Sequence, residues 1–133
     1  GFCVMGGIFS EGIDLIGNRL IGVAVVGTGI PQVNCEREIL KNYYDAKGEQ
    51  GFDYAYRYPG MNKVLQSAGR VIRTKEDTGT ILLMDERFVS REYQALFPRE
   101  WNDAGICALE NVEQQIGKFW KQRERQFQKE KHK

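Results

Sequence analysis

Two short apolar runs constrain this chain most, because stretches with a helical pattern separate them. Residues 20–27, LIGVAVVG, and residues 80–84, TILLM, are typical of strands that are buried on both faces. Between them, residues 34–47 and 61–73 repeat apolar side chains with the period of a helix. Strands that alternate with helices pair in parallel. The sequence therefore predicts an α/β fold, in which helices flank a parallel sheet.

The first of these helices carries its own start and stop signals. Asn34 is a residue type that caps helix N-termini, and Gly48 is one that ends helices. Residues 48–60 are rich in glycine and tyrosine, and we expect them to form a connection between the two helices.

Further elements are expected on either side of this core. Residues 2–9, FCVMGGIF, form an apolar run that predicts another strand, and residues 90–97 predict a short helix that Ser90 caps. Because the chain opens inside a strand, we expect it to be a piece of a longer protein. A long helix is expected over residues 109–130. Its apolar positions form one stripe: Leu109, Val112, Ile116, Phe119 and Trp120.

Composition excludes several classes of function. The 133 residues suffice for one domain, and the formal net charge of +1 gives no overall field for nucleic acid or membranes. Cys3, Cys35 and Cys107 are isolated, which argues against a zinc site or a disulfide framework and predicts no metal ligands. Isolated cysteines suit a reducing compartment, so a cytoplasmic location is expected. No apolar run approaches the roughly 18 residues of a membrane span.

The helix expected at residues 61–73 has two distinct faces. At about 100° per residue, Gln66, Arg70 and Arg73 fall within about 60° of one another. Gly69 lies beside them, although glycine costs roughly 1 kcal/mol against alanine in a helix interior, which indicates close approach by a backbone or ligand. The opposite face is aliphatic, and we expect it to pack on the sheet: Val64, Leu65, Ala68, Val71 and Ile72.

Two arginines three residues apart mildly destabilise a helix, so an anion is expected opposite them. One interpretation is that neighbouring carboxylates or water satisfy the two guanidinium groups. The other is a phosphate clamp, since arginine presents fixed, forked donors that match phosphate oxygens and stabilise charge during phosphoryl transfer.

Several motifs resemble those of one enzyme family. QSAGRVIR, residues 66–73, resembles motif VI of superfamily 2 helicases, and GGIFSEGIDLIG, residues 6–17, resembles their motif V. The form of motif V, the GTGIP turn at residues 27–31 and the D-x-R-F element at residues 85–88 are similar to the DinG/XPD branch. The resemblance covers roughly residues 2–101.

The resemblance implies part of the second RecA-like lobe of an ATP-dependent DNA helicase. By matching positions, Arg73 would be the main arginine finger and Arg70 its partner at the phosphates. The remaining implied sites fall into two groups: Gln66, Gly69 and Asp14 at ATP, and Ser10, Glu11 and Gly12 along single-stranded DNA. The family also implies 5′-to-3′ movement and a role in DNA repair.

The resemblance also implies what must come from elsewhere. The phosphate-cradling G-x-x-x-x-G-K-[ST] loop is missing, and no acidic pair stands in a plausible context for Mg²⁺, since Asp85 and Glu86 follow motif VI. ATP, Mg²⁺ and any iron–sulfur cluster would be held mainly by the first RecA-like lobe upstream. We therefore expect residues 1–104 to form a motor-lobe fragment that is inactive alone, and residues 105–133 a helical tail.

Alternatives remain open at this point. The chain could serve as a non-motor module that binds nucleic acid or protein, or as the helicase part of a nuclease–helicase fusion. A cut sheet could expose a strand edge and pair with a second copy of the chain. The charged tail is either a solvated helix end or a contact to the DNA backbone. Five tyrosines either cover the edges of the core or stack on bases: Tyr43, Tyr44, Tyr54, Tyr56 and Tyr58.

Overall fold

The computed structural model describes residues 1–7, 20–74 and 77–131. The chain divides into two compact units, residues 1–96 and residues 97–133. The two expected strands and the helices between them belong to the first unit, and the long helix belongs to the second.

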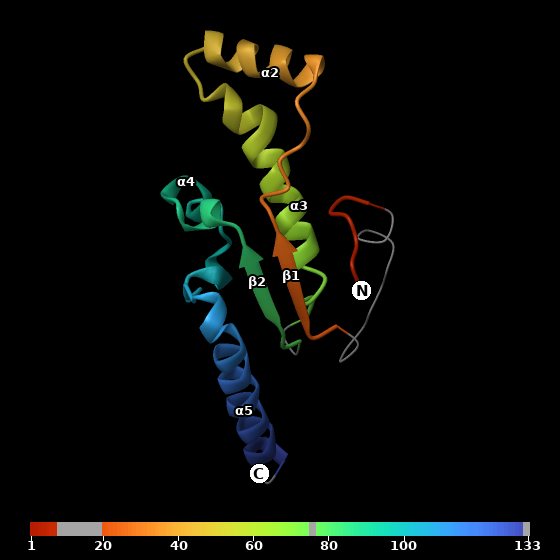
Figure 1. Cartoon of the computed structure of the whole chain (residues 1–133), viewed down its shortest axis with the longest axis vertical. Coiled ribbons are helices and arrows are strands. Elements are labelled where there is room, and N and C mark those ends of the chain that lie inside the picture. The colour runs from red at the N-terminus through yellow and green to blue at the C-terminus, as the bar shows by residue number, and fades with distance from the viewer. Residues whose placement is uncertain (8–19, 75–76, 132–133) are drawn as a thin grey trace. The chain divides into compact units, whose positions relative to one another are not determined.

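A parallel pair of strands organises the first unit. Strand β1 (Gly22–Val26) pairs with strand β2 (Thr80–Met84), with Gly22 opposite Thr80 and Val26 opposite Met84. A helix runs alongside the pair (Figure 1). The predicted α/β fold with a parallel sheet flanked by helices is confirmed, because a chain that leaves one strand and returns in parallel must cross over through an intervening segment.

The prediction of a strand at residues 2–9 is wrong for residues 2–7, the part of that range that the structure describes. Residues 1–7 form no strand, and the N–H of Gly7 donates to the carbonyl oxygen of Val4 over 3.0 Å. Gly6 has a φ of +74°, in the left-handed region that glycine adopts without strain. The glycines that interrupt the apolar run therefore turn the chain.

The first helix of the crossover matches its sequence signals. Helix α2 (Cys35–Ala46) starts at Asn34, whose side-chain oxygen accepts the N–H of Arg37 over 2.9 Å. The helix ends before Gly48, which has a φ of +78°. The predicted cap and the predicted stop are both confirmed, since each depends on local backbone geometry.

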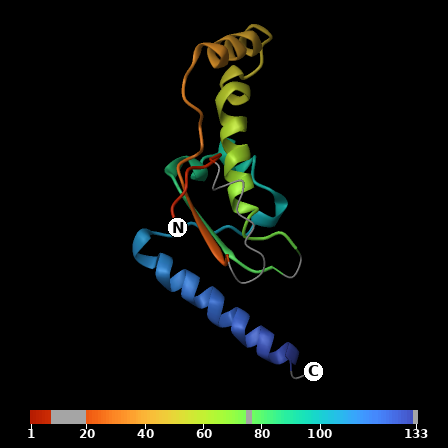
Figure 2. The ribbon, with the colours of Figure 1, turned by 90° about the vertical axis from the view of Figure 1, so that its right-hand side faces the viewer.

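The connection expected at residues 48–60 is mostly helical. Residues 51–68 form a continuous helical segment, in which a π-helix (Asp53–Arg57) leads into helix α3 (Tyr58–Ala68). Figure 2 shows α2 and this segment as a helical hairpin that extends beyond the two strands. The glycines that indicated a connection are accommodated in a helical segment, and Pro59 stands in the first turn of α3, where proline is tolerated.

Pro59 also explains one contact across the hairpin. It has no N–H, so it cannot donate to the carbonyl oxygen of Ala55 four residues earlier. Arg37 of α2 supplies that bond, because its guanidinium donates to the Ala55 oxygen over 2.7 Å. A helical bond removed by proline is thus replaced by a tertiary one.

Tyrosines join the two arms of the hairpin. The rings of Tyr44 and Tyr54 stack with their centroids 4.0 Å apart. Tyr56 is 3% exposed, and its hydroxyl donates to Glu38 over 2.5 Å. Within the second arm, the Arg57 guanidinium forms an ion pair with Asp53 over 2.6 Å. The tyrosine contacts join the two arms of the hairpin, and the ring of Tyr56 is buried.

Two short helices follow β2 in the first unit, a 3₁₀ helix (Glu86–Val89) and α4 (Arg91–Gln94). Ser90 occupies the expected N-cap position, although its hydroxyl makes no capping bond and the helix is shorter than residues 90–97. The apolar core of this unit is formed by the residues that are nearly inaccessible to solvent: Val25, Ala55, Tyr56, Met61, Val64, Ala68, Val71, Phe88 and Tyr93.

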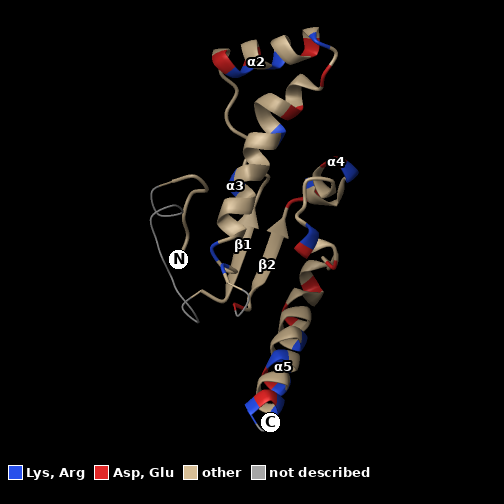
Figure 3. Cartoon of the chain, turned by 180° about the vertical axis from the view of Figure 1, so that it is seen from behind, with Lys and Arg blue, Asp and Glu red and all other residues tan. Residues whose placement is uncertain are grey.

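The second unit contains the long helix. Two 3₁₀ turns (Arg99–Trp101 and Leu109–Asn111) precede α5 (Val112–Lys131). Charged residues of both signs occur along α5 (Figure 3), and none of its residues is buried. The expected apolar stripe is present in sequence but stays largely accessible, with Leu109 and Phe119 exposed. Over the described ranges, no helix combines the length and the apolar character of a membrane-spanning segment.

Candidate functional site

Helix α3 ends earlier than the sequence predicts. Its last residue is Ala68, so the expected helix at residues 61–73 is wrong in its last turn and a half. The N–H of Gly69 still donates to Leu65, but the N–H groups of Arg70 and Val71 donate three residues back, to Ser67 and Ala68. The chain tightens into 3₁₀-type turns and then leaves the helix, because glycine and two β-branched residues favour helix continuation poorly.

This early end corrects the helical projection of the two arginines. Arg70 lies in the turn after α3, and Arg73 lies two residues beyond that turn. Because neither arginine is part of the helix, the projection at 100° per residue does not apply to them. The aliphatic face is partly confirmed. Val64, Ala68 and Val71 are buried, whereas Ile72 is 44% exposed because the chain has already turned away.

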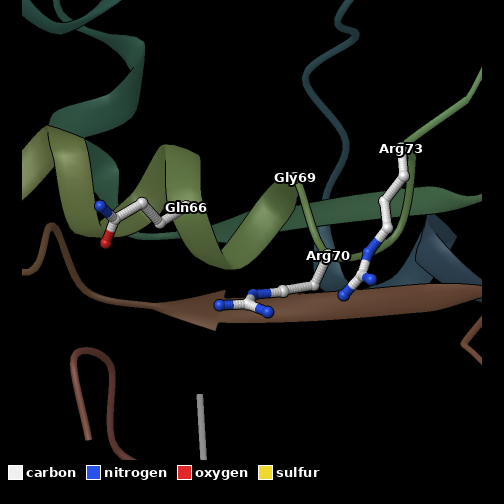
Figure 4. Close-up of a pocket in the computed structure, with 4 residues that line it drawn as sticks. All are labelled: Gln66, Gly69, Arg70 and Arg73. Atoms are coloured by element: carbon white, nitrogen blue, oxygen red, sulfur yellow. The ribbon is translucent and has the colours of Figure 1, made fainter. Parts of the chain in front are cut away.

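The predicted polar residues nevertheless come together. Gln66, Gly69, Arg70 and Arg73 line one pocket with a volume of about 580 Å³. Figure 4 shows the two arginine side chains extending to the same side of the segment that follows α3, with Gln66 further back along the helix. The turn after α3, and not a shared helix face, therefore brings these residues to the same pocket.

Gly69 lies at the end of α3 and is exposed, which corrects its expected place in a helix interior. Its φ of −64° is open to any residue, so backbone strain does not require glycine here. A Cβ at this position would lie 3.2 Å from the carbonyl oxygen of Leu65. A side chain would therefore crowd the last turn of α3 at the wall of the pocket.

Asp77 is a residue of this site that the motif reading missed. One of its carboxylate oxygens, Oδ2, accepts the N–H of Arg73 over 3.0 Å and the N–H of Thr74 over 2.8 Å. The hydrogen bonds from Thr74 and Arg73 lower the pKa of Asp77. The available signal was the polar turn TKEDTG, since aspartate accepts nearby backbone N–H groups in turns.

The pocket lining suits an anion. The two guanidinium groups are cationic donors, and the amide of Gln66 can donate as well. Pockets that hold small-molecule ligands and cofactors have volumes of about 300–1,000 Å³. For a divalent cation the fit is poor, because no three His, Cys, Asp or Glu side chains converge in the ranges that the structure describes. The pocket lining thus suits the phosphates of a nucleotide better than it suits a divalent cation.

The D-x-R-F element forms a local ion pair. Arg87 donates to Asp85 through Nε and a terminal nitrogen, both over 2.8 Å, and its backbone N–H also donates to Asp85 over 2.9 Å. These bonds lower the pKa of Asp85 to about 2. Both oxygens of the Asp85 carboxylate therefore accept hydrogen bonds from Arg87.

The remaining predicted site residues lie outside the described residues. They are Ser10, Glu11, Gly12 and Asp14, all within the motif V segment. Their expected positions along single-stranded DNA and at the nucleotide stay predictions.

Comparison with known proteins shows which protein family this chain matches. A family model described as the helicase C-terminal domain matches residues 1–104. The chain is 33% identical over 133 residues to the regulator of telomere elongation helicase 1 homolog of Caenorhabditis elegans, a match that covers 88% of this chain and 13% of that protein.

Two further relatives carry related names. The ATP-dependent DNA helicase DinG of Photobacterium profundum is 34% identical over 89 residues, covering 65% of this chain and 13% of that protein. The ATP-dependent DNA helicase chl1 of Schizosaccharomyces pombe is 31% identical over 120 residues, covering 83% of this chain and 14% of that protein. The chain spans 13–14% of the length of these three relatives. By the family match and these similarities, the chain belongs to the helicase C-terminal domain family, within the DinG/XPD-like group of DNA helicases.

Proposed function

We propose that this chain forms part of the second motor lobe of an ATP-dependent DNA helicase. Residues 1–104 supply the motor-lobe part, and residues 105–133 supply a helical extension. The protein that carries this chain couples ATP hydrolysis to movement along single-stranded DNA. The chain alone binds phosphate weakly and does not hydrolyse ATP, because the other half of the nucleotide site belongs to the first lobe.

The pocket at the end of α3 is the observation that carries this proposal. It places Arg70 and Arg73 together with Gln66 around one hollow, although the three residues come from a helix, the turn after it and the segment beyond that turn. Solvated charges on an outer helix face would not need to share a hollow. A phosphate clamp requires both guanidinium groups to face one hollow, because their forked donors must reach oxygens of the same phosphate group.

Each residue of the pocket has a distinct role in the proposal. Arg73 is the main arginine finger, which stabilises negative charge on the γ-phosphate as the bond to it breaks. Arg70 contacts the phosphates beside it. Gln66 orients the segment at the nucleotide, and Gly69 keeps the pocket wall open. ATP brings the reactive phosphoanhydride, and Mg²⁺ is held by the first lobe.

The residues of motif V complete the proposal on the DNA side. Asp14 lies toward the nucleotide, and Ser10, Glu11 and Gly12 border single-stranded DNA. This part of the proposal is supported by the order of the motifs and by the names of the relatives, among them an ATP-dependent DNA helicase.

The test is an Arg73→Ala substitution in the protein that carries this chain. We expect DNA-stimulated ATP turnover to fall by about 10³-fold or more, in line with other arginine fingers. Arg91→Ala is the matched control, because Arg91 is an exposed arginine at the start of α4 and does not line the pocket. Near-normal turnover after Arg73→Ala would remove the proposal.

A further inference from the structure

The segment that carries Arg73 is held by a carboxylate four residues further along the chain. Up to Val71, backbone N–H groups donate back to the helix, as Val71 does to Ala68 over 3.1 Å. At Arg73 and Thr74 the N–H groups donate instead to Oδ2 of Asp77. The N–H of Asp77 donates in turn to the carbonyl oxygen of Thr74 over 3.3 Å. The backbone of Arg73 is therefore fixed by Asp77 after the helical bonds have ended.

This arrangement has a geometric consequence for the pocket. A single oxygen that accepts two successive N–H groups fixes the direction of the peptide planes on both sides of the Arg73 Cα. The direction of those planes sets where the arginine side chain leaves the backbone. The long side chain of Arg73 reaches the pocket from that starting point (Figure 4).

The charge of Asp77 supports the same arrangement. The N–H groups of Thr74 and Arg73 hold the pKa of Asp77 below its ordinary value, and the positive charge of Arg73 lowers the pKa further. The side chain is consequently an anion at neutral pH, and charge-assisted hydrogen bonds to backbone N–H groups are stronger than neutral ones.

We propose that Asp77 is the positioning residue for the Arg73 finger. This inference rests on the proposed function of Arg73. Asp77 acts through the backbone of Arg73 and does not contact the nucleotide itself. Its loss lets the segment after α3 move, and a displacement of about 1 Å at a reacting group costs on the order of 10²-fold in rate.

The experiment compares five variants in the protein that carries this chain: Asp77→Ala, Asp77→Asn, Asp85→Ala, Arg73→Ala and the Asp77→Ala/Arg73→Ala double variant. The kcat and KM for ATP are measured with single-stranded DNA, and backbone hydrogen exchange of residues 70–77 is measured without nucleotide. Asp85→Ala is the matched control. Asp85 also accepts a backbone N–H, at the start of the 3₁₀ helix, but its partner is Arg87, which does not line the pocket.

We expect Asp77→Ala to lower kcat by on the order of 10²-fold while KM changes less than about threefold. Hydrogen exchange of the Arg73 and Thr74 amides should accelerate in the same variant. Asp77→Asn should keep most of the wild-type kcat and most of the slow hydrogen exchange at Arg73 and Thr74, because an amide oxygen can accept the same two N–H groups. Asp85→Ala should leave kcat unchanged, and adding Asp77→Ala to Arg73→Ala should cause no further loss.

Two results would overturn the inference while the proposed function stands: an unchanged kcat in Asp77→Ala, or equal losses in Asp77→Ala and Asp85→Ala. Near-normal turnover in Arg73→Ala would instead remove the proposed function. If Asp77→Ala does not fold, Asp77→Glu replaces it, because the longer side chain keeps the charge but displaces the accepting oxygen. A wild-type kcat in Asp77→Glu together with unchanged exchange at residues 73 and 74 would also overturn the inference.

Discussion

Gly29 and Gly60 meet backbone to backbone where the loop after β1 crosses the first turn of α3. A Cβ on Gly60 would lie 2.7 Å from the carbonyl oxygen of Thr28, and a Cβ on Gly29 would lie 2.8 Å from the carbonyl oxygen of Gly60. Both distances are too short for real Cβ contacts, and each partner atom belongs to the backbone. The two glycines therefore set how closely α3 can approach the end of β1.

Replacing Gly60 by alanine should destabilise this crossing. The added methyl group can be accommodated only by moving backbone, and such overpacking costs typically 1–3 kcal/mol. Hydrogen exchange of the α3 amides in the protein that carries this chain measures the free energy of local opening.

Gly117→Ala in α5 is the matched control for that measurement. Nothing lies within 4 Å of an added Cβ at Gly117, so alanine should stabilise the helix by up to about 1 kcal/mol through its higher helix propensity. Equal effects of the two substitutions would show that close backbone contact is not what requires Gly60.

The hydroxyl of Tyr56 should stabilise the helical hairpin. It donates to Glu38 across the two arms, and this bond raises the pKa of Tyr56 because a carboxylate disfavours the ionised phenol. Tyr56→Phe should lower the free energy of local opening of α2 by about 1.5–3 kcal/mol, the usual contribution of a bond to a charged acceptor. Hydrogen exchange of the α2 amides is the measurement.

Tyr43→Phe controls for the general effect of removing a phenol. Tyr43 is exposed, and its ring makes an edge contact with Tyr44, which the substitution keeps. A change within about 0.5 kcal/mol is expected at such a surface position. A loss in Tyr43→Phe as large as that in Tyr56→Phe would contradict the assigned role of the buried bond.

The shape of the Arg73 side chain should matter beyond its charge. Lysine keeps the positive charge at this position but lacks the planar fork that matches phosphate oxygens. In Arg73→Lys, the affinity for ATP should therefore stay within about tenfold of wild type. The factor by which kcat falls should be at least about tenfold larger than the factor by which the affinity falls. Titration with a non-hydrolysable ATP analogue and steady-state turnover separate the two effects, and full turnover with lysine would show that charge alone suffices.

The Asp85–Arg87 ion pair should make stability depend on acid pH. The pKa of Asp85 is about 2 in the folded protein, below the usual value of roughly 3.9. A lowered folded-state pKa means that the stabilisation is complete above about pH 4 and is lost as the pH falls toward 2. The difference in unfolding midpoint between wild type and Arg87→Ala should thus shrink over that range.

Arg123→Ala provides the comparison for this pH dependence. Arg123 donates to the neutral amide of Gln126 in α5, so its removal involves no carboxylate that titrates in this range. Its small effect on the unfolding midpoint should stay constant between pH 5 and pH 2. A constant difference for Arg87→Ala as well would contradict the lowered pKa of Asp85.

Local signals in the sequence determined several features correctly. The two strands follow from short β-branched and aliphatic runs, and their parallel pairing follows from the helical segments between them. The start and stop of α2 follow from Asn34 and Gly48, because a cap depends only on the few residues around it. The motif also named Gln66, Gly69, Arg70 and Arg73, which line one pocket, while their roles at ATP stay predictions.

Periodicity was a poorer guide wherever distant contacts compete with local preference. It extended α3 to residue 73, although the chain leaves the helix after Ala68. It also missed the helical character of residues 51–60, where Pro59 and Gly60 resemble a loop in isolation. There, Arg37 replaces the bond that Pro59 removes, and the loop after β1 packs on Gly60.

By itself, then, the sequence determined the alternation of strands and helices and the residue types of the pocket. Only the tertiary structure decided that α3 ends at Ala68, so that a turn and the Asp77-bound segment after it, rather than one helix face, bring Arg70 and Arg73 into the same hollow. The physical reason is that residue type and spacing encode local propensity, whereas the point at which a helix ends depends on which N–H groups find partners outside the helix.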